Sequence, residues 1–277
     1  MRRPAAIALL VAVVVAGCGY KKEPTGAIEP TFPVTVQDAA GRSIRVTHAP
    51  ATILVLDPAG AKILRGIGVK LTLLAPDAPI AQLRARHPDL LVLPPDTSRG
   101  DADTISQRVG APAYVLAGFQ LQLIEQGAAQ LGIATGHALA GRNLALALRD
   151  RRLRLVKRIE SAKPQTVFVD TGFEYAIGPG DLLANLVKAA RGTVVGTAQP
   201  QPVSAARLRK LAPDVYLIER SSKETLKVLR HRKATKDLAA VRSGRVLILN
   251  DHLVEPDQDA YRALELIARF LHPESLP

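Results

Sequence analysis

The chain has 277 residues, of which 47% are hydrophobic, and a formal net charge of +12. This length suffices for one large domain or two of moderate size. Its one cysteine excludes a disulfide within the chain. Such an excess of positive charge favours a nucleic acid, an anionic membrane surface or an acidic small molecule as the partner.

Residues 1–17 have the pattern of an export signal. Arg2 and Arg3 precede an apolar run that is too short to span a bilayer comfortably. Val15-Ala16-Gly17-Cys18 resembles the bacterial lipobox, in which the cysteine is lipidated and becomes the mature N-terminus. The alternative is a plain signal peptide with a chance cysteine. We therefore expect a cell-envelope protein anchored on the extracytoplasmic side of a bacterial membrane, where it binds no nucleic acid.

Residues 18–33 predict a lipidated tether, because they are rich in Lys, Pro and Gly and show no periodicity. A first α/β lobe is predicted over residues 34–134. It opens with a β-hairpin, in which two alternating runs flank the turn Asp38–Gly41. The remaining elements are buried strands at 53–56, 71–75, 90–93 and 113–116 and helices at 59–67, 80–87, 103–109 and 121–131.

A long helix is predicted over residues 137–160, within a connecting segment at 135–163. Its composition of Leu, Ala, Arg and Lys favours a helix. An apolar stripe runs along one side at Leu144, Leu148, Leu155 and Ile159. At 1.5 Å per residue the helix would be roughly 36 Å long. We expect it to be a strut that joins two lobes; the alternative is an ordinary helix on the outside of a single sheet.

A second α/β lobe is predicted over residues 164–277, with strands at 166–170, 193–195, 215–218 and 246–249 and helices at 181–190, 205–211, 223–229 and 257–271. The segment LRARHPDLLVL, from Leu83 to Leu93, matches LRKLAPDVYLI, from Leu208 to Ile218, in Leu, Arg, Pro and Asp. Each copy is a helix end, a Pro-Asp turn and a buried strand. The predicted fold class is therefore α/β, with two Rossmann-like lobes of mostly parallel sheets joined by one long helix and preceded by a β-hairpin.

Several segments, in their order and spacing behind the lipobox, carry a resemblance to a known family. They are VTVQDAAGRSIRV, ATILVLDP, HPDLLVL, IGPGDLLANLVKAARG, APDVYLIE, AVRSGRVLILND and ALELIARFLHP. The chain resembles the substrate-binding lipoproteins of bacterial ABC importers, and more closely the helical-backbone class that captures iron–siderophore complexes, haem or cobalamin. The resemblance covers roughly Phe32 to Pro273. It implies a monomer that binds a small-molecule metal chelate between its lobes and delivers it to an ABC permease, with no cofactor of its own.

In this class the ligand lies against loops at the carboxyl ends of the strands, in line with the general rule for open α/β sheets. Phe173 and Tyr175 could stack on a catecholate, corrin or porphyrin ring, or they could close the sheet edge. Arg99 and Arg220 could hold ligand carboxylates or catecholate oxygens, or they could be merely solvated. The nominated residues and loops are Asp57, Pro58, Pro94–Arg99, Phe119, Phe173–Tyr175, Glu219–Ser222 and Asp251–Glu255, which includes His252.

Two other groups of residues receive a plainer interpretation. Asp181 is predicted to cap a helix rather than to border an anion site. The segment 250–257 is the densest cluster of possible metal ligands, but its members share one loop and have no complementary set elsewhere. Asp257 is expected to cap the next helix. We therefore expect no metal bound directly by the protein, since a chelate brings its own metal.

The positions expected to dock onto the permease depart from the family's pattern. In the family an acidic residue in each lobe, seven residues before the Pro of each Pro-Asp turn, commonly contacts arginines of the permease. Ala81 and Ala206 stand at these positions, and Asp77 is the nearest acidic residue in the first lobe. We expect docking through other contacts; the alternative is a sensor or scaffold that does not feed an importer.

The sequence contains no G-x-S-x-G, H-E-x-x-H or phosphate-loop motif, so we expect no enzyme. The positive net charge favours an anionic ferric siderophore over cobalamin or haem. A continuous helix resists bending, so we expect little closure of the lobes on binding. The basic runs at 149–154 and 230–233 are expected to be mostly solvated, with attraction to anionic lipid near the anchor as the alternative for the first.

Overall fold

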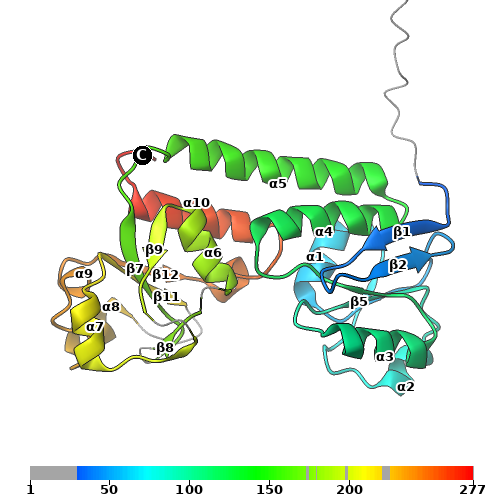
Figure 1. Cartoon of the computed structure of the whole chain (residues 1–277), viewed down its shortest axis with the longest axis horizontal. Helices are drawn as coiled ribbons and strands as arrows, with labels where there is room; N and C mark the ends of the chain where they lie inside the picture. Colours follow the sequence, from blue (N-terminus) through cyan, green and yellow to red (C-terminus); the bar gives the residue numbers. More distant parts are fainter. Residues whose placement is uncertain (1–29, 173–174, 179, 197–198, 220–224, 277) are drawn as a thin grey trace, which may run out of the picture.

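The chain folds into two α/β lobes beneath one long helix, as Figure 1 shows. The structure is a computed structural model, and it describes residues 30–172, 175–178, 180–196, 199–219 and 225–276. Each lobe has its own mainly parallel sheet, so the predicted fold class is confirmed.

The first lobe begins with the predicted hairpin. The buried carboxylate of Asp38 accepts hydrogen bonds from Arg42 Nε at 2.9 Å and from the backbone amide of Val115 at 3.2 Å, which ties the hairpin turn to the sheet. The four sheet strands are parallel, in the order β4-β3-β5-β6. The elements of this lobe are β1 (Val34–Gln37), β2 (Ser43–Val46), β3 (Ile53–Val55), α1 (Pro58–Gly66), β4 (Thr72–Leu73), α2 (Ile80–Arg84), β5 (Leu90–Leu93), α3 (Arg99–Val109), β6 (Ala113–Val115) and α4 (Leu121–Ala134).

In the second lobe β7 pairs in parallel with β11 on one side and with β9 on the other. On the same side as β9, the end of β7 also pairs antiparallel with β8, and β8 pairs antiparallel with β10. The sequence did not predict β8, β10 or α9, because these short elements do not stand out as the apolar runs by which the equally short sheet strands could be predicted. The elements are β7 (Gln165–Asp170), β8 (Tyr175–Ala176), α6 (Leu182–Ala189), β9 (Gly192–Val194), β10 (Gln201–Pro202), α7 (Ala205–Leu211), β11 (Val215–Glu219), α8 (Leu226–His231), α9 (Ala239–Arg242), β12 (Val246–Leu249), the short 3-10 turn η2 (Asp251–Leu253) and α10 (Ala260–Leu271).

The two Pro-Asp segments fold alike. His87 and Ala212, directly before the two prolines, adopt left-handed φ angles of 45° and 41°. Asp89 then accepts from the backbone amide of Thr52 at 2.8 Å, and Asp214 accepts from that of Thr166 at 2.8 Å. Each aspartate thereby fixes the start of a neighbouring parallel strand. Helix α2 ends at Arg84, three residues before His87, where the sequence predicted its end.

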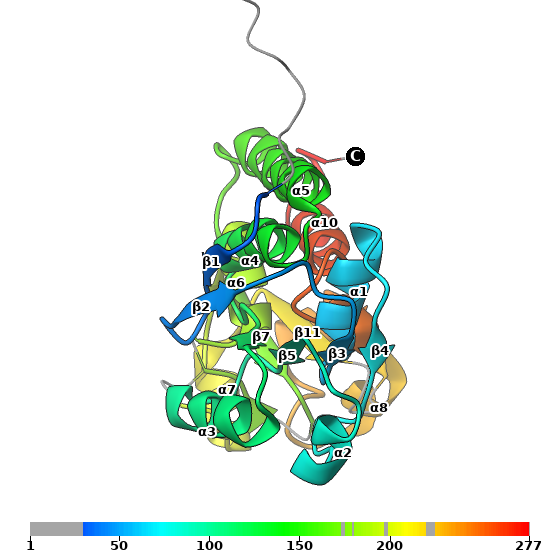
Figure 2. The ribbon, with the colours of Figure 1, turned by 90° about the vertical axis from the view of Figure 1, so that its right-hand side faces the viewer.

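The long helix α5 (Ala138–Arg158) lies along α4 and α10 and extends over both lobes (Figures 1 and 2). It buries Leu148 and Leu155, as the apolar stripe predicts. Gly132 and Gly141 let α4 turn sharply into α5, because a Cβ on Gly132 would lie 2.8 Å from the Cα of Gly141. Since the lobes have separate sheets, the alternative of a helix outside a single sheet is wrong.

Two ion pairs and one tyrosine connect α5 with its neighbours. Arg152 binds Glu125 of α4 through two hydrogen bonds of 2.7 and 3.0 Å, and the hydroxyl of Tyr261 in α10 donates to the same carboxylate at 3.0 Å. Arg151 binds Glu265 of α10 at 2.6 and 2.7 Å. The expectation that the basic run 149–154 is mostly solvated is therefore wrong for these two arginines.

Candidate functional site

The carboxyl ends of the parallel strands carry acidic side chains in both lobes. In the first lobe Asp57 follows β3 and Asp96 follows β5. In the second lobe Glu219 ends β11, and Asp251 and Glu255 follow β12. Open α/β sheets bind ligands at these ends, so the candidate site is rich in carboxylates.

Asp57 shows how the local sequence places such a group. Its carboxylate caps α1, accepting from the backbone amide of Gly60 at 2.9 Å, and Pro58 occupies the first helical position. Burial raises the pKa of Asp57 despite this hydrogen bond, and the nearby charge of Asp96 raises it further. The capping aspartate therefore lies in a locally negative environment.

The carboxylates of the two lobes interact with one another. Partial burial raises the pKa of Glu255, and Asp57, across the lobe boundary, raises it further. Burial likewise raises the pKa of Glu219, with additional contributions from Asp251 and Asp181. The negative charges thus form one connected set that reaches from the first lobe to the second. We call this set the strand-end carboxylates; its members are Asp57, Asp96, Asp181, Glu219, Asp251 and Glu255.

Among the described residues, Lys62 of α1 is a cation that lies beside this set. Its ammonium group pairs with Asp257 at 3.3 Å and with Asp259, both in the second lobe. Burial alone would lower the pKa of Lys62, but the two carboxylates outweigh it and raise the pKa. Lys62 is therefore engaged, whereas in the described part of the chain no strand-end carboxylate forms an ion pair. Asp257 serves this inter-lobe pair and accepts from the amide of Asp259 at 2.6 Å, so it is not the cap of α10, which begins at Ala260.

Among the described residues the strand ends are mostly acidic, whereas the chain as a whole has a net charge of +12. Arg220 and Lys223, which follow Glu219, lie outside the described residues. A signal was present in the sequence, because successive apolar runs end on an acidic residue. These runs are ILVLD (53–57), LVLPPD (91–96), VFVD (167–170), YLIE (216–219) and LILND (247–251).

The structure places six of the eight nominated single residues, with Tyr175 placed by its backbone alone. Asp57 and Pro58 lie at the start of α1, and His252 is exposed in η2. Arg99 is an exposed first residue of α3, behind the capping Ser98, and not a loop residue as expected. Tyr175 opens β8, paired with Pro202. Phe119, between β6 and α4, is 44% exposed. Phe173 and Arg220, like Cys18, lie outside the described residues, and the ligand-binding roles of all eight stay predictions.

Asp181 caps α6 as predicted, accepting from the backbone amide of Leu183 at 2.8 Å. No group of three or more His, Cys, Asp or Glu side chains in the described residues is arranged to hold a metal ion. No helix within these residues is long and apolar enough to cross a bilayer.

A hollow of about 420 Å³ lies between the lobes on the side of the helices. This hollow is lined by helices α4, α5 and α6 and not by the strand-end loops. Its charged groups are cationic, and they include Arg152, Lys188 and Arg191. The side of the lobe junction beneath α5 is therefore basic, while the strand ends are acidic.

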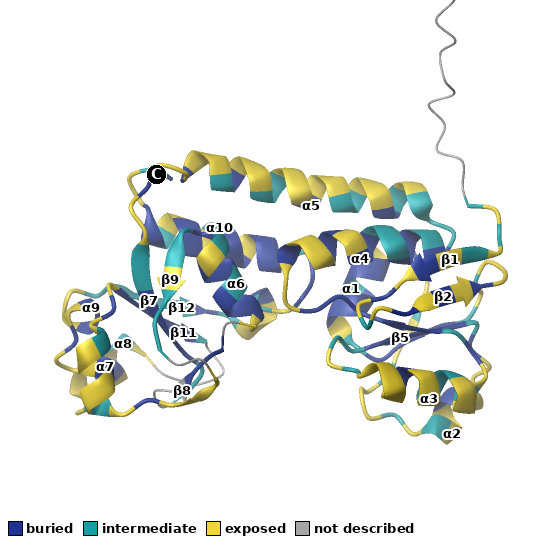
Figure 3. Cartoon of the chain, viewed as in Figure 1, coloured by how far each residue is buried: buried dark blue, intermediate teal, exposed yellow. Residues whose placement is uncertain are grey.

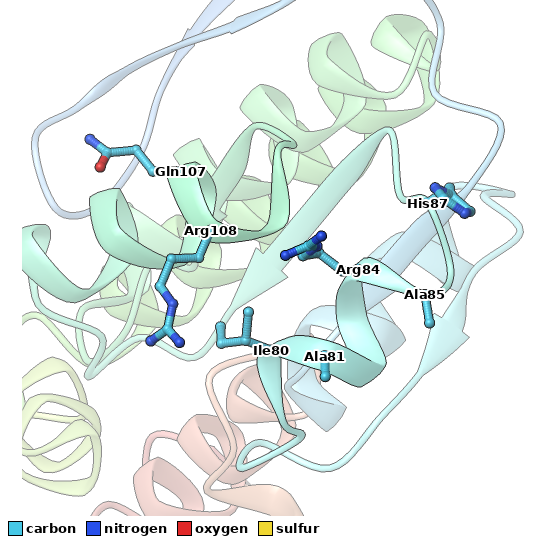
Figure 4. A pocket seen from close by; sticks show the side chains of 7 residues that line it. All are labelled: Ile80, Ala81, Arg84, Ala85, His87, Gln107 and Arg108. Atoms are coloured by element: carbon cyan, nitrogen blue, oxygen red, sulfur yellow. The ribbon is translucent and has the colours of Figure 1, made fainter.

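The surface around Ala81 is also basic. Ala81 borders a hollow of about 830 Å³ between α2 and α3, and Figure 4 shows Arg84, His87 and Arg108 around it. In the second lobe Ala206 is exposed on α7, in the sequence AARLRKL. Both positions expected to carry a docking glutamate thus lie on cationic helices.

No family model matches the chain, and no curated protein matches it by sequence. Solved structures do match. The vitamin B12 binding protein of Vibrio cholerae superimposes with a TM-score of 0.70 at 18% identity, over 83% of this chain and 99% of that one. An ABC-type Fe3+-hydroxamate transport protein of Saccharomonospora viridis gives 0.67 at 18% identity, over 87% and 99% of the two chains.

A Helicobacter pylori protein with bound Ni(II) gives a TM-score of 0.74 at 12% identity, over 87% of this chain and 90% of that one. At these identities the likeness concerns the fold. The chain has the fold of ABC transporter substrate-binding proteins of the helical-backbone class, which confirms the resemblance drawn from its sequence.

Proposed function

We propose that this protein is the extracytoplasmic solute-binding component of an ABC importer, and that it captures a metal chelate between its lobes without chemical change. The fold supports this role, since the solved structures that share it include proteins for vitamin B12 and for Fe3+-hydroxamate transport. A lipid anchor at Cys18 would hold it at the membrane.

The observation that carries the ligand proposal is the connected set of strand-end carboxylates. The binding free energy of a ligand that contacts these groups is more favourable when the ligand's surface is neutral or cationic than when it is anionic. Three hydroxamates balance the charge of Fe3+, whereas three catecholates leave a trianion, and haem carries two propionates. The proposed ligand is therefore a ferric siderophore of the hydroxamate kind, in particular one with a free amine, with cobalamin as the alternative.

A titration of the full-length protein with a panel of ligands tests this. The panel contains ferrioxamine B, which carries a free amine, a ferric tris-catecholate, haem and cyanocobalamin, each followed by isothermal titration calorimetry. The cationic hydroxamate should bind most tightly and the tris-catecholate most weakly. Glu219→Gln with Glu255→Gln should weaken the hydroxamate about tenfold or more, while Glu265→Gln, on the far side of α10, should leave it unchanged. Tighter binding of the tris-catecholate would contradict the ligand proposal.

Transport needs a separate measurement, because ligand titration does not report on docking to the permease. The surfaces around Ala81 and Ala206 that would dock are basic. We infer that docking uses an acidic permease surface facing α2 and α7. ATP hydrolysis by the reconstituted cognate permease should rise when the loaded protein is added, and Arg84→Glu with Arg209→Glu should abolish the increase. Ligand binding with no stimulation would instead favour a sensor or scaffold.

A further inference from the structure

The outward side of α5 combines apolar and basic side chains. Leu139, Leu146 and Leu153 are 43%, 43% and 44% exposed and recur every seven residues, so they form one stripe on the helix. Figure 3 shows that the side of α5 turned away from the lobes is largely exposed. Three large exposed leucines in one row differ from the single exposed apolar residues that are normal on protein surfaces.

Arginines flank this stripe on both sides. At 100° per residue Arg142 and Arg149 fall on one side of the leucines, and Arg154 and Arg158 fall on the other. All four are exposed, and none forms an ion pair in the described part of the chain. Arg142 and Arg149, with Leu146 and Leu153, border a hollow of about 460 Å³ between α4 and α5, so this edge of the stripe lies beside α4. The one acidic residue of the helix, Asp150, lies next to Leu146 and Leu153 on the same side. We call the stripe and these four arginines the α5 outer face.

The described chain begins beside this face. Residues 1–29 lie outside the description. The ring of Phe32 lies against Gly136, directly before α5, since a Cβ on this glycine would be 3.7 Å from it. The tether expected at residues 18–33 would therefore join the rest of the molecule near the N-terminal end of α5.

We propose that the α5 outer face binds the surface of an anionic phospholipid bilayer. The leucines would enter the boundary between head groups and acyl chains, and the arginines would contact lipid phosphates. A row of apolar side chains between two rows of cations fits such a surface, because both contacts form at once along the whole helix. This proposal rests on α5 alone and stands whether or not the ligand proposal holds.

The orientation that follows has a consequence for docking. Helices α2 and α7 lie on the side of the molecule opposite α5 (Figure 1). A molecule that rests on the bilayer by α5 therefore holds α2 and α7 away from that membrane. It has to leave the lipid surface before these helices can contact a permease in the same membrane, so lipid contact describes a resting state.

A fluorophore on the α5 outer face tests the proposal. The full chain with Cys18→Ser and Asn143→Cys has one thiol, which lies on this face. The labelled protein is combined with vesicles of phosphatidylcholine alone, or of phosphatidylcholine with phosphatidylglycerol, each containing a brominated lipid that quenches on contact. Quenching should appear only with phosphatidylglycerol and should disappear at high salt. The control label, Gln82→Cys on α2, should stay unquenched.

Two sets of variants separate the contributions. Arg142→Gln, Arg149→Gln and Arg154→Gln together should lower the affinity for phosphatidylglycerol vesicles by about tenfold or more. Leu146→Asn with Leu153→Asn should lower it as well, at low and at high salt. Circular dichroism verifies that each variant is folded, which is expected since all five positions are exposed. No quenching in either vesicle, or equal quenching in both, would overturn the proposal. So would a dimer in sedimentation experiments that shields the Asn143→Cys label without vesicles, because a second copy would then cover the face.

Discussion

Neighbouring arginines of α5 offer a direct test of what holds the lobes together. Arg152 and Arg151 each form two short hydrogen bonds with one glutamate, and they differ in burial. The side chains of Arg152 and Glu125 are 13% and 9% exposed, and Tyr261 adds a third bond. Those of Arg151 and Glu265 are 35% and 36% exposed. We predict that Arg152→Ala destabilises the fold far more than Arg151→Ala.

The magnitude follows from the group that stays behind. Removing Arg152 leaves the Glu125 carboxylate buried with Tyr261 as its remaining side-chain partner, and breaking a buried pair costs roughly 3–5 kcal/mol. The hollow of about 460 Å³ between α4 and α5 borders both residues, so water can reach the pair. We therefore expect a loss at the lower end of this energy range. An exposed pair such as that of Arg151 contributes about 0.5 kcal/mol. The melting temperature should fall by roughly 6–12 °C for Arg152→Ala and by about 2 °C or less for Arg151→Ala.

Urea unfolding followed by circular dichroism measures both changes; tryptophan fluorescence cannot be used, because the chain has no tryptophan. The two variants remove the same charge from adjacent positions, so each controls for the other's effect on net charge and helix propensity. The double variant Glu125→Ala with Arg152→Ala should cost less than the sum of its single changes. Equal losses for Arg151→Ala and Arg152→Ala would refute the assignment of the buried network as the main link.

Other features allow shorter tests. Thr166 donates one hydrogen bond from its backbone amide and one from its hydroxyl to Asp214, and both lower the pKa of Asp214. The stability that Asp214 contributes is therefore present above its unfolded-state pKa and is lost as the pH falls through its folded-state pKa. Asp214→Asn should cost about 1 kcal/mol at pH 7 and almost nothing near pH 2, in urea melts at both values. Gly132→Ala should destabilise by roughly 3 kcal/mol or more, because its Cβ would meet the Gly141 backbone, whereas Gly100→Ala, with open space around it in α3, should be neutral or stabilising by up to about 1 kcal/mol. Small-angle scattering should show little compaction when the cationic hydroxamate binds, and a large decrease in the radius of gyration would contradict a rigid α5.

Much of the fold could be predicted because its strands are buried on both faces and appear as apolar runs. The Pro-Asp repeat was informative for a related reason. In each copy the residue before the proline has a left-handed φ, and the aspartate accepts a hydrogen bond from the start of an adjacent strand. A short local segment therefore fixes a contact between two strands. Helix ends were predicted less well. His87 leaves the helical conformation through a left-handed φ, and nothing in the type of that residue announces it.

The candidate site was located by topology but not by charge. Topology requires that strand-end loops of both lobes face one region, so Asp57 and the segments that contain Glu219 and Glu255 could be nominated. The net charge of +12 favoured an anionic ligand, whereas the described residues at the strand ends are mostly acidic. Exposed charges more than about 10 Å apart are screened at moderate ionic strength, so a net charge averaged over the chain is a poor guide to the sign at one site.

The raised pKa values at the strand ends predict how ligand affinity depends on pH. Burial raises the pKa of Glu219 and Glu255, so these carboxyls protonate at a higher pH than exposed glutamates. The ionised forms of these two carboxyls lower the free energy of unfolding at neutral pH. This free energy rises as the pH falls through their folded-state pKa values. A cationic ligand reverses the balance, because it binds the ionised form and lowers both pKa values.

The affinity for ferrioxamine B should therefore decrease as the pH falls through the folded-state pKa values of the free protein, and binding near those values should release protons. Calorimetry in two buffers of different ionisation enthalpy detects the released protons directly. Glu219→Gln with Glu255→Gln should bind more weakly at pH 7 yet vary less with pH, which a structural role of these side chains alone would not produce. An affinity that stays constant as the pH falls from 7 to the ordinary pKa range of glutamate, while the wild-type protein remains folded, would show that the strand-end carboxylates do not contact the ligand.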